Sequence, residues 1–272
     1  YYMFLKRFNI YVIVGLSVLF YSIELSFFIA NISKFTEGGF VTLTLAILLA
    51  SVMVIWYQSK KITKNYTEYI PIASHQHVLS DLSKDTTLTK YASHLVYLTS
   101  STNSKFIEHR IIQSIIYKRP KRADVYWLLH VHVTDNPYDK KYKVTTICKD
   151  CYYRIDFYLG FKVPQKIDLF FRNVVQNMVN EKQIDITSQY PSLNKHNITA
   201  DFKFVIQEKY LSNVSNLPWY EKIILDSYYF IKKWGINEEK IFGLDTASVK
   251  TEKFPITIRP ITNINLTKIN DE

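Results

Sequence analysis

Three polar residues lie seven positions apart in the first apolar segment of this 272-residue chain. Ser17, Glu24 and Asn31 would project from one side of a helix, because seven residues are close to two helical turns. Glu24 is the only charged residue between positions 8 and 32, and an ionised carboxylate is costly in hydrocarbon. The spacing therefore predicts a polar stripe that faces protein or water. Two roles are possible for this stripe: an ion or proton relay, or a packing contact with neighbouring helices.

Two cysteines, Cys148 and Cys151, have the C-x-x-C spacing that occurs in redox sites and in halves of zinc sites. They fall between two expected strands, which favours a plain hairpin turn. His130 and His132 would share one face of a strand and are the nearest candidates to complete a zinc site. The turn interpretation is preferred, with zinc binding and redox activity as alternatives, and we expect no metal or cofactor.

The soluble part contains one further group of residues that could do acid–base chemistry, namely Asp124, His130, His132 and Asp135. Histidines on a central strand are more often buried and hydrogen-bonded than catalytic. The chain has no glycine-rich phosphate loop, no Gly-x-Ser-x-Gly and no His-Glu-x-x-His pattern. We therefore expect that the protein is not an enzyme.

The polar stripe lies in the first of two apolar segments, residues 8–32 and 40–57, which are separated by a loop of seven residues. The second segment would be about 27 Å long as a helix, close to the thickness of a bilayer core. The first is too long for the apolar part of a secretory signal peptide and leads directly into the second. Residues 1–60 are therefore predicted to form two transmembrane helices, about 8–32 and 40–57, arranged as a hairpin.

The distribution of basic residues predicts the orientation of this hairpin. Lys6 and Arg7 precede the first segment, and three lysines, Lys60, Lys61 and Lys64, follow the second. By the positive-inside rule, both ends lie in the cytoplasm and the loop lies outside. The predicted location is the cell membrane, with a multi-pass segment in the lipid bilayer and a cytoplasmic C-terminal domain.

The rest of the chain predicts a cytosolic α/β domain. Residues 61–90 are polar and are predicted to be a linker, residues 91–258 the domain, and residues 259–272 a tail. Within the domain, apolar runs and stripes alternate between strand and helix patterns. The expected strands are 95–98, 125–133, 143–147, 152–159 and 202–206, and the expected helices are 106–117, one that begins after Pro164, and 219–234 with Gly235 as a C-cap.

The formal net charge of +10 does not identify a partner by itself. The lysines are scattered, and the chain is rich in Lys, Ile, Asn and Tyr, as expected from an A/T-biased gene. No fingerprint of a nucleic-acid-binding fold is present, so we expect no nucleic-acid partner.

Motifs in both halves of the chain resemble those of Kup-type (HAK/KUP/KT family) potassium uptake transporters. The resemblance covers roughly residues 8–258, and the second half looks like the branch found in lactic-acid bacteria. It rests on Phe27–Ile32, Lys34–Phe35, Glu37–Phe40, Tyr97–Thr99, Lys121–Trp127, Asp135–Tyr138, Leu159–Phe161, Leu217–Trp219 and Phe242–Asp245. Glu24 lies about where these transporters carry an acidic residue.

The resemblance implies a proton-coupled potassium symporter of twelve helices. The chain begins Tyr1-Tyr2-Met3, and two helices cannot enclose a transport path, so we expect the C-terminal portion of a longer protein. The potassium-binding residues would then lie on the ten preceding helices. Resemblance also suggests cyclic di-AMP as a ligand of the soluble domain, which we expect to regulate or dimerise the transporter, most simply as a homodimer. The alternative is a self-contained membrane-anchored sensor or scaffold that binds a nucleotide or a protein, and a tethered enzyme is a third interpretation.

Overall fold

The computed structural model describes residues 9–188, 190–196, 198–211, 217–235, 238–244 and 247–256. The chain divides into two compact units, residues 1–58 and residues 59–272. The predicted tail, 259–272, lies outside the described residues.

The first unit is formed by two long apolar helices. Helix α2 (Ile10–Ser33) begins where Asn9 accepts a hydrogen bond from the backbone N–H of Tyr11 at 3.1 Å. A π-helical turn, η1 (Phe35–Gly39), leads into α3 (Phe40–Asn65). Gly38 in that turn has φ +136°, a conformation that side chains disfavour. Both helices are long and apolar enough to cross a bilayer, as a membrane hairpin requires.

The second unit is built on a six-stranded sheet with the order β5-β6-β4-β2-β7-β8. All neighbouring strands are parallel except β5, which runs antiparallel to β6. Parallel strands buried on both faces explain the long apolar runs in the sequence. The strands are β2 (Lys90–Leu98), β4 (Arg122–Thr134), β5 (Lys140–Cys148), β6 (Tyr152–Gly160), β7 (Phe202–Tyr210) and β8 (Val249–Pro255).

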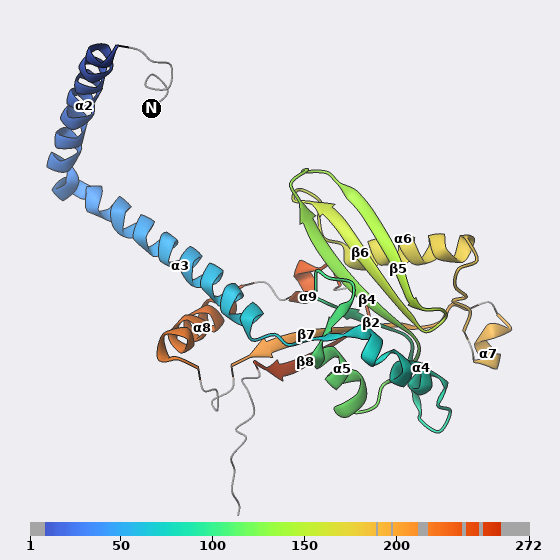
Figure 1. Cartoon of the computed structure of the whole chain (residues 1–272). Coiled ribbons are helices and arrows are strands. Elements are labelled where there is room, and N and C mark those ends of the chain that lie inside the picture. The colour runs from blue at the N-terminus through green and yellow to red at the C-terminus, as the bar shows by residue number, and fades with distance from the viewer. Residues whose placement is uncertain are drawn as a thin grey trace, which may run out of the picture. The chain divides into compact units, whose positions relative to one another are not determined.

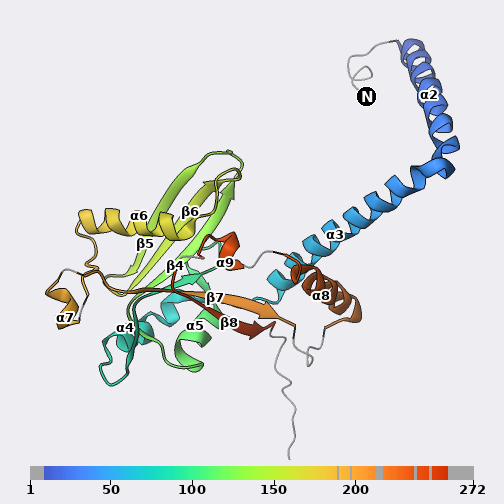
Figure 2. The ribbon, with the colours of Figure 1, turned by 180° about the vertical axis from the view of Figure 1, so that it is seen from behind.

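Helices cover both faces of this sheet (Figures 1 and 2). Helix α6 (Ile167–Asn180) packs on one face, where Phe171 contacts Trp127 edge-to-face with 5.3 Å between ring centroids. Helix α4 (Gln76–Lys84), helix α5 (His109–Ile112) and the π-helical turn η3 (Gln113–Tyr117) cover the other face, around Tyr126 and Leu128. The predicted α/β fold is therefore confirmed.

The predicted linker 61–90 is largely folded. Helix α3 continues to Asn65, and the strand β1 (Tyr69–Pro71), the 3₁₀ turn η2 (Ile72–Ser74) and α4 follow before β2 begins. Ile72 and Leu79 are buried in the core under the sheet. The apolar residues of α4, Val78, Leu79 and Leu82, do have helical spacing, but the helix has only nine residues, so the pattern is too short to stand out in a polar stretch. The structure therefore differs from the linker prediction and assigns this segment to the domain.

Two further segments differ from their predicted form. The predicted helix 106–117 begins as a strand, β3 (Phe106–Glu108), which pairs antiparallel with β1. Helix α8 (Trp219–Lys232) ends two residues before Trp234, and the backbone N–H of Gly235 donates to the carbonyl of Lys232. The short helices α7 (Pro191–Asn194) and α9 (Glu238–Ile241) complete the described elements.

Candidate functional site

The predicted polar stripe lies along α2. Ser17 is half-buried within its unit, whereas Glu24 and Asn31 are exposed. Neighbouring members of the stripe are separated by about 10 Å along the helix axis, since each residue adds about 1.5 Å. The three side chains therefore share a face without meeting at one point, and the described residues do not cover Glu24. This geometry gives no ion cage and leaves the stripe available to other parts of the membrane domain.

The predicted acid–base group is not brought together. Asp124 forms an ion pair with Lys90 at 2.6 Å, and Asp135 is exposed in the loop after β4. His130 and His132 do lie on one face of β4, with 4.2 Å between their ring centroids. The Nδ1 atom of His130 lies 2.8 Å from the carbonyl oxygen of Thr99, and burial lowers the pKa of His130. His130 thus has the hydrogen-bonded, structural role expected of a core histidine.

A buried ion pair that sequence reasoning missed stands beside these histidines. Arg154 on β6 is fully buried and donates to Asp156 at 2.7 Å and 3.0 Å. The same guanidinium donates to the carbonyl of Ser101 at 2.6 Å. The sequence did contain a signal for this pair: two oppositely charged residues that are two positions apart lie on the same face of a strand. Through this hydrogen bond to Ser101, Arg154 fixes the loop that follows β2.

The two cysteines are free thiols: Cys148 ends β5, and Cys151 lies in the turn that leads into β6. Burial raises the pKa of Cys151 to about 11, the opposite of the lowered pKa of a redox-active thiol. Tyr152, next to Cys151, pairs with Tyr126, four residues before His130 on β4. Four residues of strand span about 13 Å, so the histidines are too far away to complete a zinc site. In the described part of the chain, no group of three or more possible metal ligands is present.

A cavity of about 570 Å³ lies beside the carboxyl ends of β7 and β8, against α8. That edge of a parallel sheet is the usual position of ligand sites in α/β folds, and the volume falls within the range of small-molecule pockets. Its lining residues are Ile206, Glu208, Lys209, Tyr210, Leu211, Asp226, Tyr229, Lys232, Lys233, Glu239, Thr251 and Lys253.

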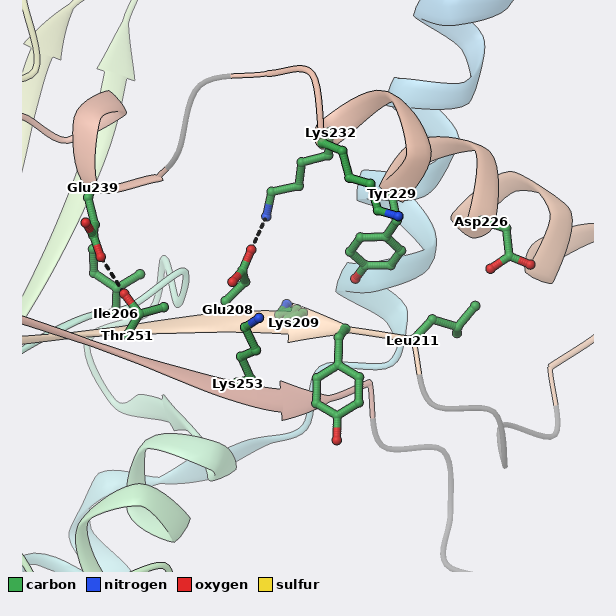
Figure 3. A pocket seen from close by; sticks show the side chains of 12 residues that line it. Ile206, Glu208, Lys209, Leu211, Asp226, Tyr229, Lys232, Glu239, Thr251 and Lys253 are labelled. Atoms are coloured by element: carbon green, nitrogen blue, oxygen red, sulfur yellow. Dashed lines mark hydrogen bonds and ion pairs between the residues drawn. The ribbon is translucent and has the colours of Figure 1, made fainter.

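Charged and aromatic side chains shape this pocket (Figure 3). Lys232 reaches from α8 toward Glu208 on β7, with 3.5 Å between their charged atoms. Thr251 on β8 donates to Glu239 at 2.5 Å. The lining carries four lysines and three carboxylates, so a bound anionic group would meet a slight excess of positive charge.

No local pattern in the sequence marks this pocket, because its residues come from three separate segments, 206–211, 226–239 and 251–253. Only the crossover from β7 through α8 to β8 brings them together. Nothing in the sequence distinguishes the lysines of these segments from the lysines that are scattered over the rest of the chain.

Comparisons with known proteins agree with the two-part organisation. Residues 1–61 match the family model described as the K+ potassium transporter integral membrane domain, and residues 92–266 match the K+ potassium transporter C-terminal domain. No solved structure matches the chain.

Several curated proteins are similar over nearly the whole chain. The "Probable potassium transport system protein Kup" of Flavobacterium johnsoniae is 54% identical over 269 residues, which cover 99% of this chain and 41% of that protein. The protein of the same name from Cytophaga hutchinsonii is 46% identical over 270 residues, with 99% and 41% coverage. "Probable potassium transport system protein Kup 2" of Lactococcus lactis is 32% identical over 251 residues, with 92% and 37% coverage. The chain thus spans about two fifths of the length of these relatives. Because the C-terminal domain match alone covers well over half of its residues, the chain belongs to the K+ potassium transporter family.

Proposed function

We propose that this chain supplies the last two membrane helices and the cytoplasmic C-terminal domain of a potassium uptake transporter that works as a proton symporter. The observation that carries this proposal is the order of the two family matches, membrane domain first and C-terminal domain second. A self-contained sensor is less well supported, because residues 1–61 match a transporter membrane domain rather than a generic anchor. Potassium-binding residues are expected outside this chain.

The orientation can be tested at the loop between α2 and α3. The lysines that follow the second span support a cytoplasmic C-terminal domain. A Thr36→Cys variant, in a background where Cys148 is replaced by Ser, should react with a membrane-impermeant thiol reagent added outside the cell. Reaction only after the cytoplasmic side is opened would refute this topology.

Glu24 is proposed to face protein in the complete transporter, since the cost of a carboxylate in lipid favours a polar neighbour. The test is potassium uptake by a deficient strain that expresses the complete open reading frame containing this chain. Glu24→Gln should keep packing and most uptake, Glu24→Leu should impair assembly, and Leu25→Ile serves as the matched control. Loss of uptake in the Gln variant at normal expression would instead support an ion relay, and a Leu variant without any effect would refute both roles.

The C-terminal domain is proposed to regulate transport by binding cyclic di-AMP in the pocket between α8 and the strands β7 and β8. The two phosphates of this molecule suit the lysine-rich lining, and its adenines suit stacking on Tyr229. Ligand at about 100 times its dissociation constant should stabilise the domain by about 2.7 kcal/mol. The assay is a melting shift of the full chain, with Lys253→Ala expected to abolish it and Lys195→Ala, outside the pocket, to preserve it.

A full chain that melts cooperatively but shows no shift would remove the nucleotide proposal. Homodimerisation through the domain would then be the remaining regulatory role. Light scattering of the purified chain in detergent measures it directly, and a mass equal to one chain would exclude it.

A further inference from the structure

Helix α8 has apolar residues on two opposite faces. On its inner face, Leu225 is fully buried and clusters with Ile62 and Ile256. On its outer face, Trp219 is 76% exposed and Phe230 is 63% exposed. Every helix that packs on a domain has a buried apolar face. The exposed apolar face of α8 is therefore the feature that calls for an explanation.

The outer face carries several exposed apolar side chains on one side of the helix. At about 100° per residue, Trp219, Ile223 and Phe230 fall within about 40° of arc around the helix. Trp234, in the turn that follows, is 84% exposed, more than any other large apolar residue in the described part of the chain. Large apolar side chains grouped on one exposed face of a domain are typical of an interaction surface. We refer to these four residues as the aromatic face of α8.

The inner face of α8 packs on the residues that directly follow the second membrane span. The Nζ atom of Lys60 lies 5.8 Å from the centre of the Tyr228 ring, and the hydroxyl of Tyr66 donates to Glu221 at 2.8 Å. Lys60 is three residues beyond Tyr57, where the apolar run of the second span ends. Three residues of helix span about 5 Å, so the chain itself holds α8 close to the surface of the bilayer.

The chemistry of α8 matches that surface. Tryptophan is enriched at the level of lipid headgroups, where an apolar ring with one polar atom is half in water. Lys222 and Lys233 are exposed and lie on one side of the aromatic face, with Asp226 between the lysines and that face in the helical projection. Aromatic residues on one side and lysines beside them are the pattern of helices that lie in the interface and contact anionic lipid.

We propose that α8 is an interfacial anchor, and that its aromatic face inserts among the lipid headgroups of the membrane that the chain spans. The inference rests on the two membrane spans and the geometry of α8, and it does not depend on potassium uptake. A second copy of the chain, or another part of the membrane domain, is the competing occupant of this face.

The test places a fluorescent probe on the aromatic face of the full chain. Phe230→Cys, in a Cys148→Ser background, is labelled with an environment-sensitive dye and reconstituted into vesicles of phosphatidylcholine and phosphatidylglycerol. Tyr117→Cys is the matched control, since Tyr117 is 75% exposed and lies in η3. Lipids with a nitroxide on the acyl chain close to the headgroup report contact with the bilayer.

The dye at position 230 should emit at shorter wavelength than the dye at position 117, and the nitroxide lipid should quench it about twofold. Replacing Lys222 and Lys233 by Gln should weaken the quenching, as should vesicles of phosphatidylcholine alone. Water-like emission at position 230 without quenching would overturn the proposal. A short-wavelength emission without quenching would overturn it too, because protein would then cover the face.

A folding control keeps this result interpretable. Ile223→Ser removes an exposed side chain and should leave the thermal unfolding of the full chain unchanged, whereas Leu225→Ser should destabilise it. If Ile223→Ser unfolds the domain, the outer face is part of the core, and the anchor proposal is wrong.

Discussion

A soluble protein that begins at Gln58 should fold, whereas one that begins at Ser83 should not. A boundary near residue 83 follows from treating residues 61–90 as a linker. The structure instead places Ile62, Ile72 and Leu79 in buried clusters, and it pairs β1 with β3. A protein that starts at Ser83 lacks all three side chains and the strand partner of β3.

The magnitude follows from the burial of these side chains. Ile62 is 7% exposed, Ile72 4% and Leu79 1%. At about 1.5–3 kcal/mol for each buried aliphatic side chain, their loss costs roughly 5–9 kcal/mol, an upper estimate because unfolded chains also bury some surface. Domains of this kind have net stabilities of about 5–15 kcal/mol. Removal of the segment should therefore consume most or all of the stability.

The assay is urea denaturation of both proteins, followed by near-ultraviolet circular dichroism in mild detergent that shields the outer face of α8. The longer protein should unfold cooperatively, and the shorter one should lack a transition. Within the longer protein, Leu79→Ala should cost about 2–5 kcal/mol, while Val78→Ala, at a 46% exposed neighbour, should change stability by less than about 0.5 kcal/mol. Equal midpoints and slopes for the two proteins would refute the assignment of this segment to the domain.

Three further predictions concern buried polar groups. Glu252→Ala leaves the buried ammonium of Lys121 without its carboxylate 3.0 Å away and should cost about 3–5 kcal/mol in urea denaturation, while Lys121→Met combined with Glu252→Leu should restore most of it. Burial lowers the pKa of His94 from 6.5 to about 4, so the unfolded chain binds the proton more tightly and stability, full above pH 6.5, should fall by up to about 3 kcal/mol as the pH drops toward 4. His94→Gln should flatten that dependence in the same assay. Because the pKa of Cys151 is raised to about 11, iodoacetamide at about pH 8 should label Cys148 and spare Cys151 until the chain is denatured, as peptide mass spectrometry would show.

The parts of the fold that the sequence predicted are those whose signal is local. The apolar run 125–133 falls inside β4, and the stripe after Pro164 matches α6, because a long central strand and a core-facing helix each display their own period. The structure of residues 61–90 and 106–108 was not predicted, because these segments have little local signal. The pairing of β1 with β3 joins residues more than 30 positions apart in the sequence.

The candidate sites show the same distinction. The spacing of Ser17, Glu24 and Asn31 places them on one face of α2, which local periodicity fixes. Asp124 and His130, which the sequence offered as members of one acid–base group, do not meet, since Asp124 lies six residues before His130 on the same strand and pairs with Lys90. A strand extends by about 3.3 Å per residue, so proximity in sequence does not imply proximity in space along β4.

Helix α8 connects the pocket to the membrane-proximal end of the domain. One side of it contributes Tyr229 and Lys232 to the pocket, and Leu225 on the same helix packs with Ile62, just after the second span. A ligand that bridges Lys232 and Glu208 would therefore act on the helix that contacts residues 59–66. If such a ligand binds one position of α8 more tightly than another, it must shift the helix toward that position, and a shift imposed at residues 59–66 must change ligand affinity by the same factor. This reciprocity makes the contact between Leu225 and Ile62 the place where regulation of transport by a pocket ligand should be sought.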